Sequence, residues 1–484
     1  MPNSDTLIRN ALVFDGSGEE PQLLDVALAG GRITALGSPL PHIGARIIDA
    51  HGLALAPGFI DVHTHDDLYV LQDPAMLPKL SQGVTTVIVG NCGISASPVR
   101  LRAALPDPMN LLGRADDFCY PTFESYRAAV RAARPAVNVG ALIGHTALRN
   151  NHMDRLDREA TASEVAAMRA ELADALAGGA LGLSTGLAYA SARSATTEEV
   201  LGVAAPLADA GALYTTHMRT EADGILEALR EGFTIGRQSR IPVVISHLKC
   251  AGIANWGRAG EVLEALDTAR QAQSAGCDCY PYAAGSSTLD LGQVDPRVQI
   301  TITWSDSHPE VGGRSLASIA EQWQVTQVEA ARSLQPAGAI YHSISESDMR
   351  RILSHPATMI GSDGLPQDPR PHPRLWGTFP RVLGRYSRDE KLLSLTEAIR
   401  KMTAMPAQRF GLADRGWVRP GFFADLVLFD AQTIVDTATF TDPIRPAQGI
   451  HAVWVNGVLT YTADGPTGIH AGEFLLRAST VWMQ

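Results

Sequence analysis

Residues of the kinds that bind metal ions closely follow five short apolar segments of this chain. The first segment, residues 59–62, runs into a His-Thr-His triplet, and each of the other four leads to a single such residue. In chain order they are His63, His65, Cys92, His217, His247 and Asp363. Imidazole, thiolate and carboxylate groups are the ligands that Zn²⁺ prefers. Because residues two apart in a strand point to the same side, His63 and His65 can reach one ion together.

Each of these residues also has an ordinary structural interpretation. A single histidine after a strand is more often a hydrogen-bonded structural residue, Cys92 alone is typical of packing, and Asp363 in Ser-Asp-Gly suits a turn. Their occurrence at five strand ends favours the metal site. His145 follows a further apolar segment, and there substrate contact and structural hydrogen bonding stay equally open.

The apolar segments alternate with helical stretches, as in a parallel sheet wrapped by helices. We count eight of them: residues 59–62, 84–89, 137–143, 181–183, 212–216, 242–245, 277–280 and 358–360. Eight is the number of strands that a closed (β/α)8 barrel of the TIM type requires. The predicted fold class is therefore α/β. Since the carboxyl ends of barrel strands form the active-site face, the candidate ligands should converge there.

The two ends of the chain differ in pattern from the middle, because they show short strands separated by glycine turns. The sequence predicts a hairpin at Asn456-Gly457. We expect residues 1–57 and 414–484 to build one small β-sandwich domain, and residues 58–413 to build the barrel. Residues at about 283–345 show no βα repeat, and we interpret them as an insertion over the barrel mouth.

Composition limits the possible partners and location. The 484 residues carry a formal net charge of −11, which argues against a nucleic-acid partner. No apolar run reaches the ~18 residues of a membrane helix, and the first residues lack the basic and apolar blocks of an export signal. We therefore expect a cytoplasmic protein without a membrane partner. Five cysteines in so long a chain do not suggest a disulfide framework, and the oligomeric state stays open.

Several motifs resemble those of one enzyme family. Residues 57–65, Pro-Gly-Phe-Ile-Asp-Val-His-Thr-His, look like the opening motif of the amidohydrolase superfamily. Further stretches resemble the D-aminoacylases within it, and the resemblance covers nearly the whole chain. They are residues 90–93, 182–187, 216–219, 246–249, 361–364 and 372–381.

The resemblance implies roles for single residues. Cys92, His217 and His247 would hold one tightly bound zinc ion, whereas His63 and His65 would form a weaker second site that Cys92 can bridge. Asp363 would be the catalytic acid and base. Many relatives bridge two metals with a carboxylated lysine on the fourth strand, but residues 181–184 contain no lysine.

The substrate of such an enzyme carries a carboxylate that needs a cation. Arg374 is the best candidate because guanidinium binds carboxylate in a bidentate manner. Tyr189 and Lys249 resemble its helpers in the family, and Tyr280 or Tyr282 is a further candidate. For Tyr189 packing, and for Lys249 a surface charge, are the alternatives.

The resemblance implies zinc-dependent hydrolysis of N-acyl-D-amino acids to a carboxylate and a free D-amino acid. One alternative is selectivity for N-acyl-D-glutamate, if Arg297 of the insertion binds an acidic side chain; a surface position is the preferred interpretation of that arginine. A cyclic-amide hydrolase, similar to a hydantoinase or dihydroorotase, shares the opening motif but fits residues 372–381 poorly. A non-catalytic scaffold is disfavoured because all six candidate metal-site residues are present.

Overall fold

The barrel predicted from the eight apolar segments is present in the structure, a computed structural model that describes residues 5–41 and 45–478. The first four residues, which are part of the segment that we expected to lack an export signal, lie outside this range. The barrel strands are β6 (Phe59–Asp61), β7 (Val84–Val89), β8 (Asn138–Ala141), β9 (Ile143–Gly144), β10 (Gly182–Gly186), β11 (Leu213–His217), β12 (Val243–Ile245), β13 (Ala275–Cys279) and β17 (Thr358–Ile360).

All neighbouring barrel strands run parallel. One sheet has the order β17-β13-β12-β11-β10-β9, and another has the order β6-β7-β8. The third predicted strand is divided into β8 and β9 at Leu142. The N–H of Leu142 donates to Val89 O at the end of the neighbouring strand β7. A parallel bridge between Thr64 and Gly364 joins the ends of β6 and β17 and closes the barrel.

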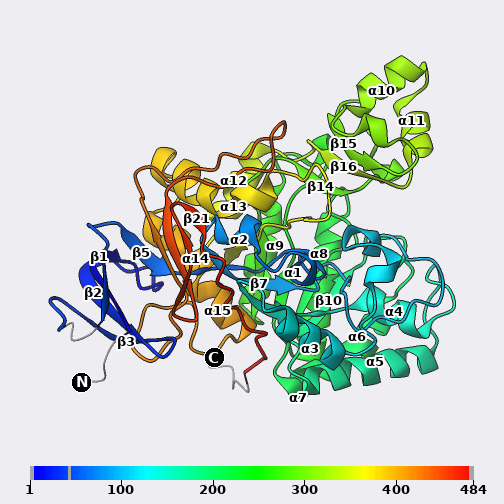
Figure 1. The fold of residues 1–484 in the computed structure, drawn as a ribbon. Helices are drawn as coiled ribbons and strands as arrows, with labels where there is room; N and C mark the ends of the chain where they lie inside the picture. Colours follow the sequence, from blue (N-terminus) through cyan, green and yellow to red (C-terminus); the bar gives the residue numbers. More distant parts are fainter. Residues whose placement is uncertain (1–4, 42–44, 479–484) are drawn as a thin grey trace.

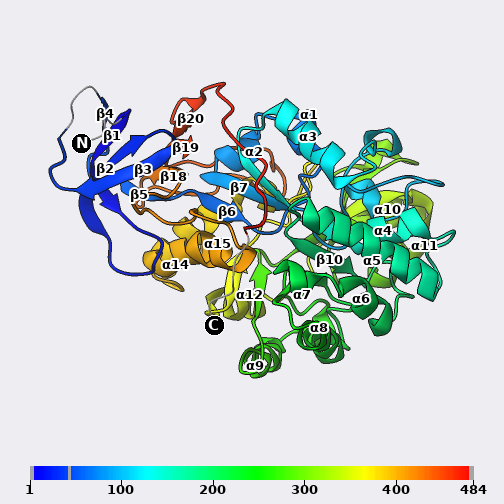
Figure 2. The same cartoon turned by 90° about the horizontal axis from the view of Figure 1, so that it is seen from below.

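Helices cover the outside of the barrel (Figures 1 and 2). They include α3 (Phe123–Ala133), α4 (His145–His152), α5 (Ala162–Ala177), α6 (Thr197–Ala204), α8 (Ile225–Ser239), α9 (Ala259–Arg270), α12 (Glu346–Ser354), α13 (Arg374–Arg381), α14 (Leu395–Met402) and α15 (Ala404–Phe410). Helix α5 begins as its sequence predicts, because Thr161 accepts a hydrogen bond from Glu164 N. A short helix, α2 (Leu77–Leu80), follows β6.

Strands from both ends of the chain share one nine-stranded sheet. Its main order is β21-β20-β19-β18-β5-β1-β2-β3, and β4 pairs with β1. Their bounds are β1 (Thr6–Val13), β2 (Gln22–Ala29), β3 (Arg32–Gly37), β4 (Arg46–Asp49), β5 (Ala54–Pro57), β18 (Leu426–Phe429), β19 (Ile450–Val455), β20 (Val458–Thr462) and β21 (Gly465–Pro466). The Asn456-Gly457 turn joins β19 to β20, with positive φ at both residues, as a tight hairpin requires. The division at residues 57 and 414 stays a prediction.

The segment between β13 and β17 folds as a lobe with its own apolar core, upper right in Figure 1. Strands β14 (Gly285–Thr288), β15 (Ile300–Ser305) and β16 (Ala337–Tyr341) form an antiparallel sheet in the order β14-β16-β15. Helices α10 (Leu316–Trp323) and α11 (Gln327–Leu334) pack on it. This lobe corresponds to the predicted insertion.

No helix in the described part of the chain has both the length and the apolar character needed to cross a membrane. A cytoplasmic location stays a prediction of the sequence.

Candidate metal centre and active site

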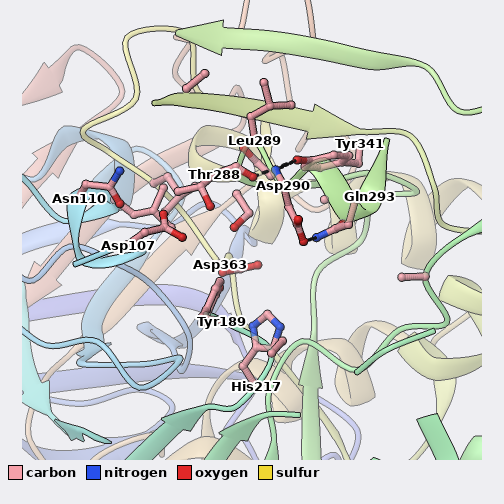
Figure 3. Close-up of a pocket in the computed structure, with 18 of the residues that line it drawn as sticks. Asp107, Asn110, Tyr189, His217, Thr288, Leu289, Asp290, Gln293, Tyr341 and Asp363 are labelled. Atoms are coloured by element: carbon pink, nitrogen blue, oxygen red, sulfur yellow. Dashed lines mark hydrogen bonds between the residues drawn. The ribbon is translucent and has the colours of Figure 1, made fainter. Parts of the chain in front are cut away.

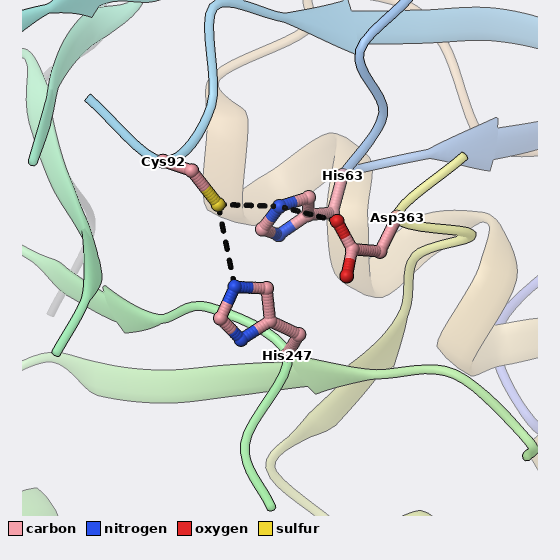
Figure 4. A group of neighbouring side chains, drawn as sticks. All are labelled: His63, Cys92, His247 and Asp363. Carbon is pink, nitrogen blue, oxygen red and sulfur yellow. Dashed lines mark hydrogen bonds and ion pairs between the residues drawn. The ribbon is translucent and has the colours of Figure 1, made fainter. Parts of the chain in front are cut away.

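The candidate ligands from distant parts of the sequence lie together at the carboxyl ends of the barrel strands. His63, Cys92, His247 and Asp363 are buried, and each places one donor atom within 4.8 Å of the others (Figure 4). An overlapping group consists of His217, Glu221 and His247. The convergence of these groups is the arrangement that the strand ends predicted.

The distances between donor atoms suit a tetrahedral metal ion. Cys92 Sγ lies 3.2 Å from His63 Nε2 and 3.3 Å from His247 Nε2. His217 Nδ1 lies 3.0 Å from His247 Nε2. Zinc bonds of about 2.0–2.3 Å in a tetrahedral arrangement separate their donors by roughly 3.4–3.6 Å. The donors are of the types that zinc prefers and lie slightly closer together than in a loaded site, and Cys92 lies between His63 on one side and His247 on the other.

Three of these residues have a left-handed backbone. The φ angle is 54° at Cys92, 36° at His247 and 50° at Asp363. Each residue comes shortly after a barrel strand, where the chain leaves the sheet. For a residue with a Cβ this conformation costs about 1–2 kcal/mol. Strain of this kind at three strand ends that converge on one site is typical of a functional site.

Asp278 was not singled out in the sequence, yet it contacts two of the histidines. Its Oδ1 accepts a hydrogen bond from His247 N at 2.9 Å and lies 3.2 Å from His63 Nδ1. A carboxylate on the far nitrogen of a ligating imidazole fixes its tautomer and orientation. The signal was present in Cys277-Asp278-Cys279, because alternation along β13 points Asp278 to the opposite side from its two neighbours.

Glu221 is the second residue that the sequence analysis missed. Its Oε1 lies 2.9 Å from His247 Nδ1 and 2.6 Å from Lys249 Nζ. Burial opposes its charge, but Lys249 and the two histidines His247 and His217 lower the pKa of Glu221 to about 2. It follows β11 in an irregular loop, where no periodicity marks it. Lys249 is thus paired with a carboxylate at the edge of the site, not exposed as a surface charge.

The electrostatics of the cluster favour a thiolate at Cys92. Burial alone would raise its pKa, but His63 and His247 lower the pKa of Cys92 well below its usual value. Burial likewise opposes charge on His63, whereas Asp278 and Cys92 raise the pKa of His63 well above its usual value. A metal ion that binds here must displace the protons of these imidazoles, so metal affinity should depend on pH.

Asp363 lies between the histidines and Arg374. Its Oδ1 is 3.2 Å from His65 Nε2 and 3.5 Å from His63 Nε2, and its Oδ2 is 2.9 Å from an Nη of Arg374. Burial opposes the carboxylate, but Arg374 and then His247 lower the pKa of Asp363 well below its usual value. The carboxylate is therefore ionised and able to accept a proton.

A cavity of about 810 Å³ opens above the cluster, between the barrel end and the lobe (Figure 3). Its inner wall includes His65, His217, His247, Asp363 and the predicted substrate residues Tyr189, Lys249 and Tyr280. Its outer wall comes from the lobe and from the loop after β7, and includes Asp107, Thr288, Leu289, Asp290 and Tyr341. The hydroxyl of Tyr280 is buried and, within the described residues, has no hydrogen-bond partner. The cavity is thus suited to a small molecule.

Arg374 lies behind this wall, with its guanidinium carbon 4.5 Å from the centre of the Tyr280 ring. One Nη donates to Ser286 O at 3.1 Å and pairs with Asp363, whereas Nε and the other Nη have no partner among the described residues. Unpaired donors of a fully buried arginine are costly, so they indicate a missing acceptor.

The structure does not bring every candidate to the cavity. His145 Nε2 lies 3.1 Å from Glu199 Oε1, a buried carboxylate that forms an ion pair with Arg149, and His145 does not line the cavity. Tyr282 is also absent from the lining and packs against Arg381 and His372. Arg297 is 66% exposed and pairs with Asp295.

A (β/α)8 barrel that gathers cysteine, histidine and aspartate at its strand ends, below a cavity, defines a metal-dependent hydrolase. The chain belongs to the amidohydrolase family, whose model matches residues 46–461. Within that family it belongs with the D-aminoacylases.

The relatives match along almost their full length. A D-aminoacylase of Alcaligenes xylosoxydans xylosoxydans is 47% identical, over 98% of this chain and 98% of its own. An N-acyl-D-aspartate deacylase of the same organism is also 47% identical, over 99% and 97%. The crystal structure of an N-acyl-D-glutamate deacylase from Bordetella bronchiseptica, complexed with zinc and a phosphonate mimic of the tetrahedral intermediate, has a TM-score of 0.95 at 43% identity, over 99% and 100%.

The cyclic-amide hydrolases are similar in fold alone. A D-hydantoinase structure has a TM-score of 0.61 at 16% identity. The alternative of a cyclic-amide hydrolase, which shares the opening motif, is therefore less well supported than a D-aminoacylase.

Proposed function

We propose that this protein hydrolyses N-acyl-D-amino acids to a carboxylate and a free D-amino acid, and that zinc is its metal. The observation that carries the proposal is the position of Asp363 at the base of the cavity, where one carboxylate oxygen faces His63 and His65 and the other faces Arg374. The full-length similarity to enzymes named for linear N-acyl-D-amino acids supports the substrate class and its stereochemistry.

The site would hold one tightly bound ion and, more weakly, a second. Cys92, His217 and His247 would hold the first, and His63 and His65 the second, with the Cys92 thiolate shared. The sulfur supports this role because it is almost equally distant from His63 Nε2 and His247 Nε2. Bound zinc would supply a Lewis acid for the amide carbonyl and for water, whose pKa it lowers to about 7.

The chain's own residues supply the remaining steps. Asp363 takes the proton from the attacking water, and it later gives this proton to the nitrogen of the leaving amine. Lys249 and the unpaired hydroxyl of Tyr280, which line the cavity, bind the α-carboxylate of the substrate, and the free guanidinium donors of Arg374, which lies behind the Tyr280 ring, complete its site. Tyr189, whose ring centre is 4.8 Å from that of His217, bounds the same end of the cavity.

Selectivity for N-acyl-D-glutamate receives no support from Arg297, because this arginine is exposed, pairs with Asp295 and does not line the cavity. The preferred interpretation of Arg297 as a surface residue agrees with that position.

The proposed function is tested with a panel of N-acetyl-D- and N-acetyl-L-amino acids, assayed for free amine with and without added zinc. The D-methionine or D-leucine derivative should react far faster than its L-isomer, and only with metal present. Equal rates on both isomers, or activity on hydantoins alone, would contradict the proposal.

The metal ligands are tested by elemental analysis of purified variants. Cys92→Ala, His217→Ala and His247→Ala should each lose zinc and activity while keeping the fold. Cys119→Ala is the matched control, because Cys119 is an exposed cysteine away from the cavity. A full zinc complement in all three ligand variants would remove the assignment.

A further inference from the structure

The seam where β6 meets β17 has little backbone pairing, although it carries three residues of the site. Within the described range, one bridge, Thr64 with Gly364, joins these strand regions. Two hydrogen bonds accompany it, from Asp363 N to His63 O at 2.6 Å and from His65 N to Gly364 O at 3.0 Å. The pair β10 and β11, in contrast, forms a continuous ladder from Gly182–Leu213 to Gly186–His217. Other contacts must therefore fix the seam.

The side chain of Asp61 supplies the first of these contacts. Its Oδ1 accepts from Ser362 N at 2.8 Å and from His63 N at 3.3 Å, and its Oδ2 accepts from Ser362 Oγ at 2.5 Å. One carboxylate on β6 thus binds the residue just before Asp363 through both backbone and side chain. All of these groups are inaccessible to solvent.

Lys79 joins both sides of the seam from outside the barrel wall. Its Nζ donates to Asp61 Oδ2 at 2.8 Å, to Thr64 Oγ1 at 2.9 Å and to Ser362 Oγ at 3.0 Å, and it lies 3.2 Å from Asp66 Oδ2. The lysine, which lies on α2, has no exposed surface. A single ammonium therefore holds oxygen atoms of the β6 end and of the β17 end together.

The network ends immediately beside the reacting carboxylate without touching the cavity. Ser362 Oγ also accepts from Gly364 N at 3.1 Å, so both neighbours of Asp363 are fixed by it. Asp363 itself has the left-handed φ of 50°, which it keeps only while its neighbours are held. Lys79 is absent from the lining of the cavity.

We propose that Lys79 is a positioning residue, which fixes the seam between β6 and β17 and thereby holds Asp363 at its place against His63 and His65. The role rests on the proposed function of Asp363. Lys79 contacts neither the substrate cavity nor the donor atoms of the ligands, so it acts only through Asp61, Thr64 and Ser362.

The test compares Lys79→Met with Lys401→Met. Lys401 is an equally buried lysine that donates to His355 O and, at 3.1 Å, to Thr358 O at the beginning of β17, the end remote from the site. Both variants should unfold at lower temperature. Only Lys79→Met should lower kcat, by about tenfold or more with KM within threefold, because a misplacement of ~1 Å can cost 10²-fold.

A second variant separates positioning from charge balance. Lys79→Met leaves Asp61 and Asp66 without a counter-charge, so Lys79→Met/Asp66→Asn, which removes one of the two unpaired charges, should recover part of the lost melting temperature. It should not recover kcat, because the link to Thr64 and Ser362 is still missing. If Lys79→Met does not fold, this double variant takes its place in the comparison.

A readout without turnover keeps this test separate from that of the proposed function. Visible absorption of Co²⁺, added in excess so that it also occupies the weaker site at His63 and His65, reports the geometry of these ligands, and it should change in Lys79→Met but not in Lys401→Met. Inactivity of the unmodified protein on every N-acyl-D-amino acid would refute the proposed function alone. A kcat within threefold of normal, an equal loss in Lys401→Met, or an unchanged Co²⁺ spectrum would overturn the role of Lys79.

Discussion

Replacing Asp363 by asparagine isolates the proton-transfer step from metal binding. The asparagine keeps an oxygen at the side chain, so Arg374, whose Nη lies 2.9 Å from Asp363 Oδ2, still has an acceptor. What is lost is the charge and the ability to take up a proton. General acid–base groups contribute on the order of 10²–10⁴-fold, which corresponds to about 2.7–5.4 kcal/mol in the barrier of the reaction.

The metal content of this variant should not change. The tight metal site would be made by Cys92, His217 and His247, so Asp363→Asn should keep one ion per chain. Initial rates with an N-acetyl-D-amino acid give kcat and KM, and elemental analysis of the same sample gives the metal content. We expect kcat to fall at least 10²-fold while KM changes little.

Asp368→Asn is the matched control for this variant. Asp368 is also buried and lies on the same loop, where it accepts a hydrogen bond from Arg370 N, but it does not line the cavity. Its replacement should leave kcat unchanged. If Asp363→Asn retains kcat within tenfold with its metal bound, the assignment of Asp363 as acid and base is wrong.

Three further predictions follow from contacts in the site and beside it. Arg374→Ala should raise KM in steady-state assays, and kcat/KM should fall about 10- to 150-fold because a charged hydrogen bond is worth roughly 1.5–3 kcal/mol. An unchanged KM would place the substrate carboxylate elsewhere. Asp278→Asn should lower kcat about 10–100-fold at saturating metal, because His63 loses the carboxylate that orients it, and normal turnover would exclude that role. Burial raises the pKa of Asp368 to about 7, so ionisation of this group costs stability as the pH rises from about 4 to 7. Chemical denaturation should therefore show that the stability advantage of Asp368→Asn over the unmodified protein grows by about 3 kcal/mol between pH 5 and pH 8, and a constant difference would contradict this.

The elements that carry the site could be predicted because each shows a local signal. The apolar runs before His63, Cys92 and His247 mark strands, and a barrel brings strand ends together whatever their separation in the chain. Capping residues such as Thr161 mark helix starts in the same local way. The eight predicted segments coincide with the barrel strands for this reason.

The residues that support the ligands could not be predicted in this way. Alternation along β13 indicates to which side Asp278 points, but Asp278 and His63 are 215 positions apart, and nothing local indicates that their side chains meet. Glu221 lies in an irregular loop, and Lys79 looks in the sequence like an ordinary helix lysine on the surface. Such partners are selected by the tertiary structure, which sequence periodicity does not describe. The same holds for His145, because the local pattern did not indicate whether its side chain contacts the substrate or a structural partner such as Glu199.

The lobe between β13 and β17 has an evolutionary consequence. Its apolar core, which includes Leu289, Ile302 and Leu334, is separate from the core of the barrel. The outer wall of the cavity is built largely from this lobe, whereas the candidate metal ligands come from the barrel. Mutations that remodel the lobe can accumulate, or a whole lobe can be exchanged by recombination, without disturbing the reacting groups. One barrel of this kind can thus give rise to enzymes for different side chains while its chemistry is inherited unchanged.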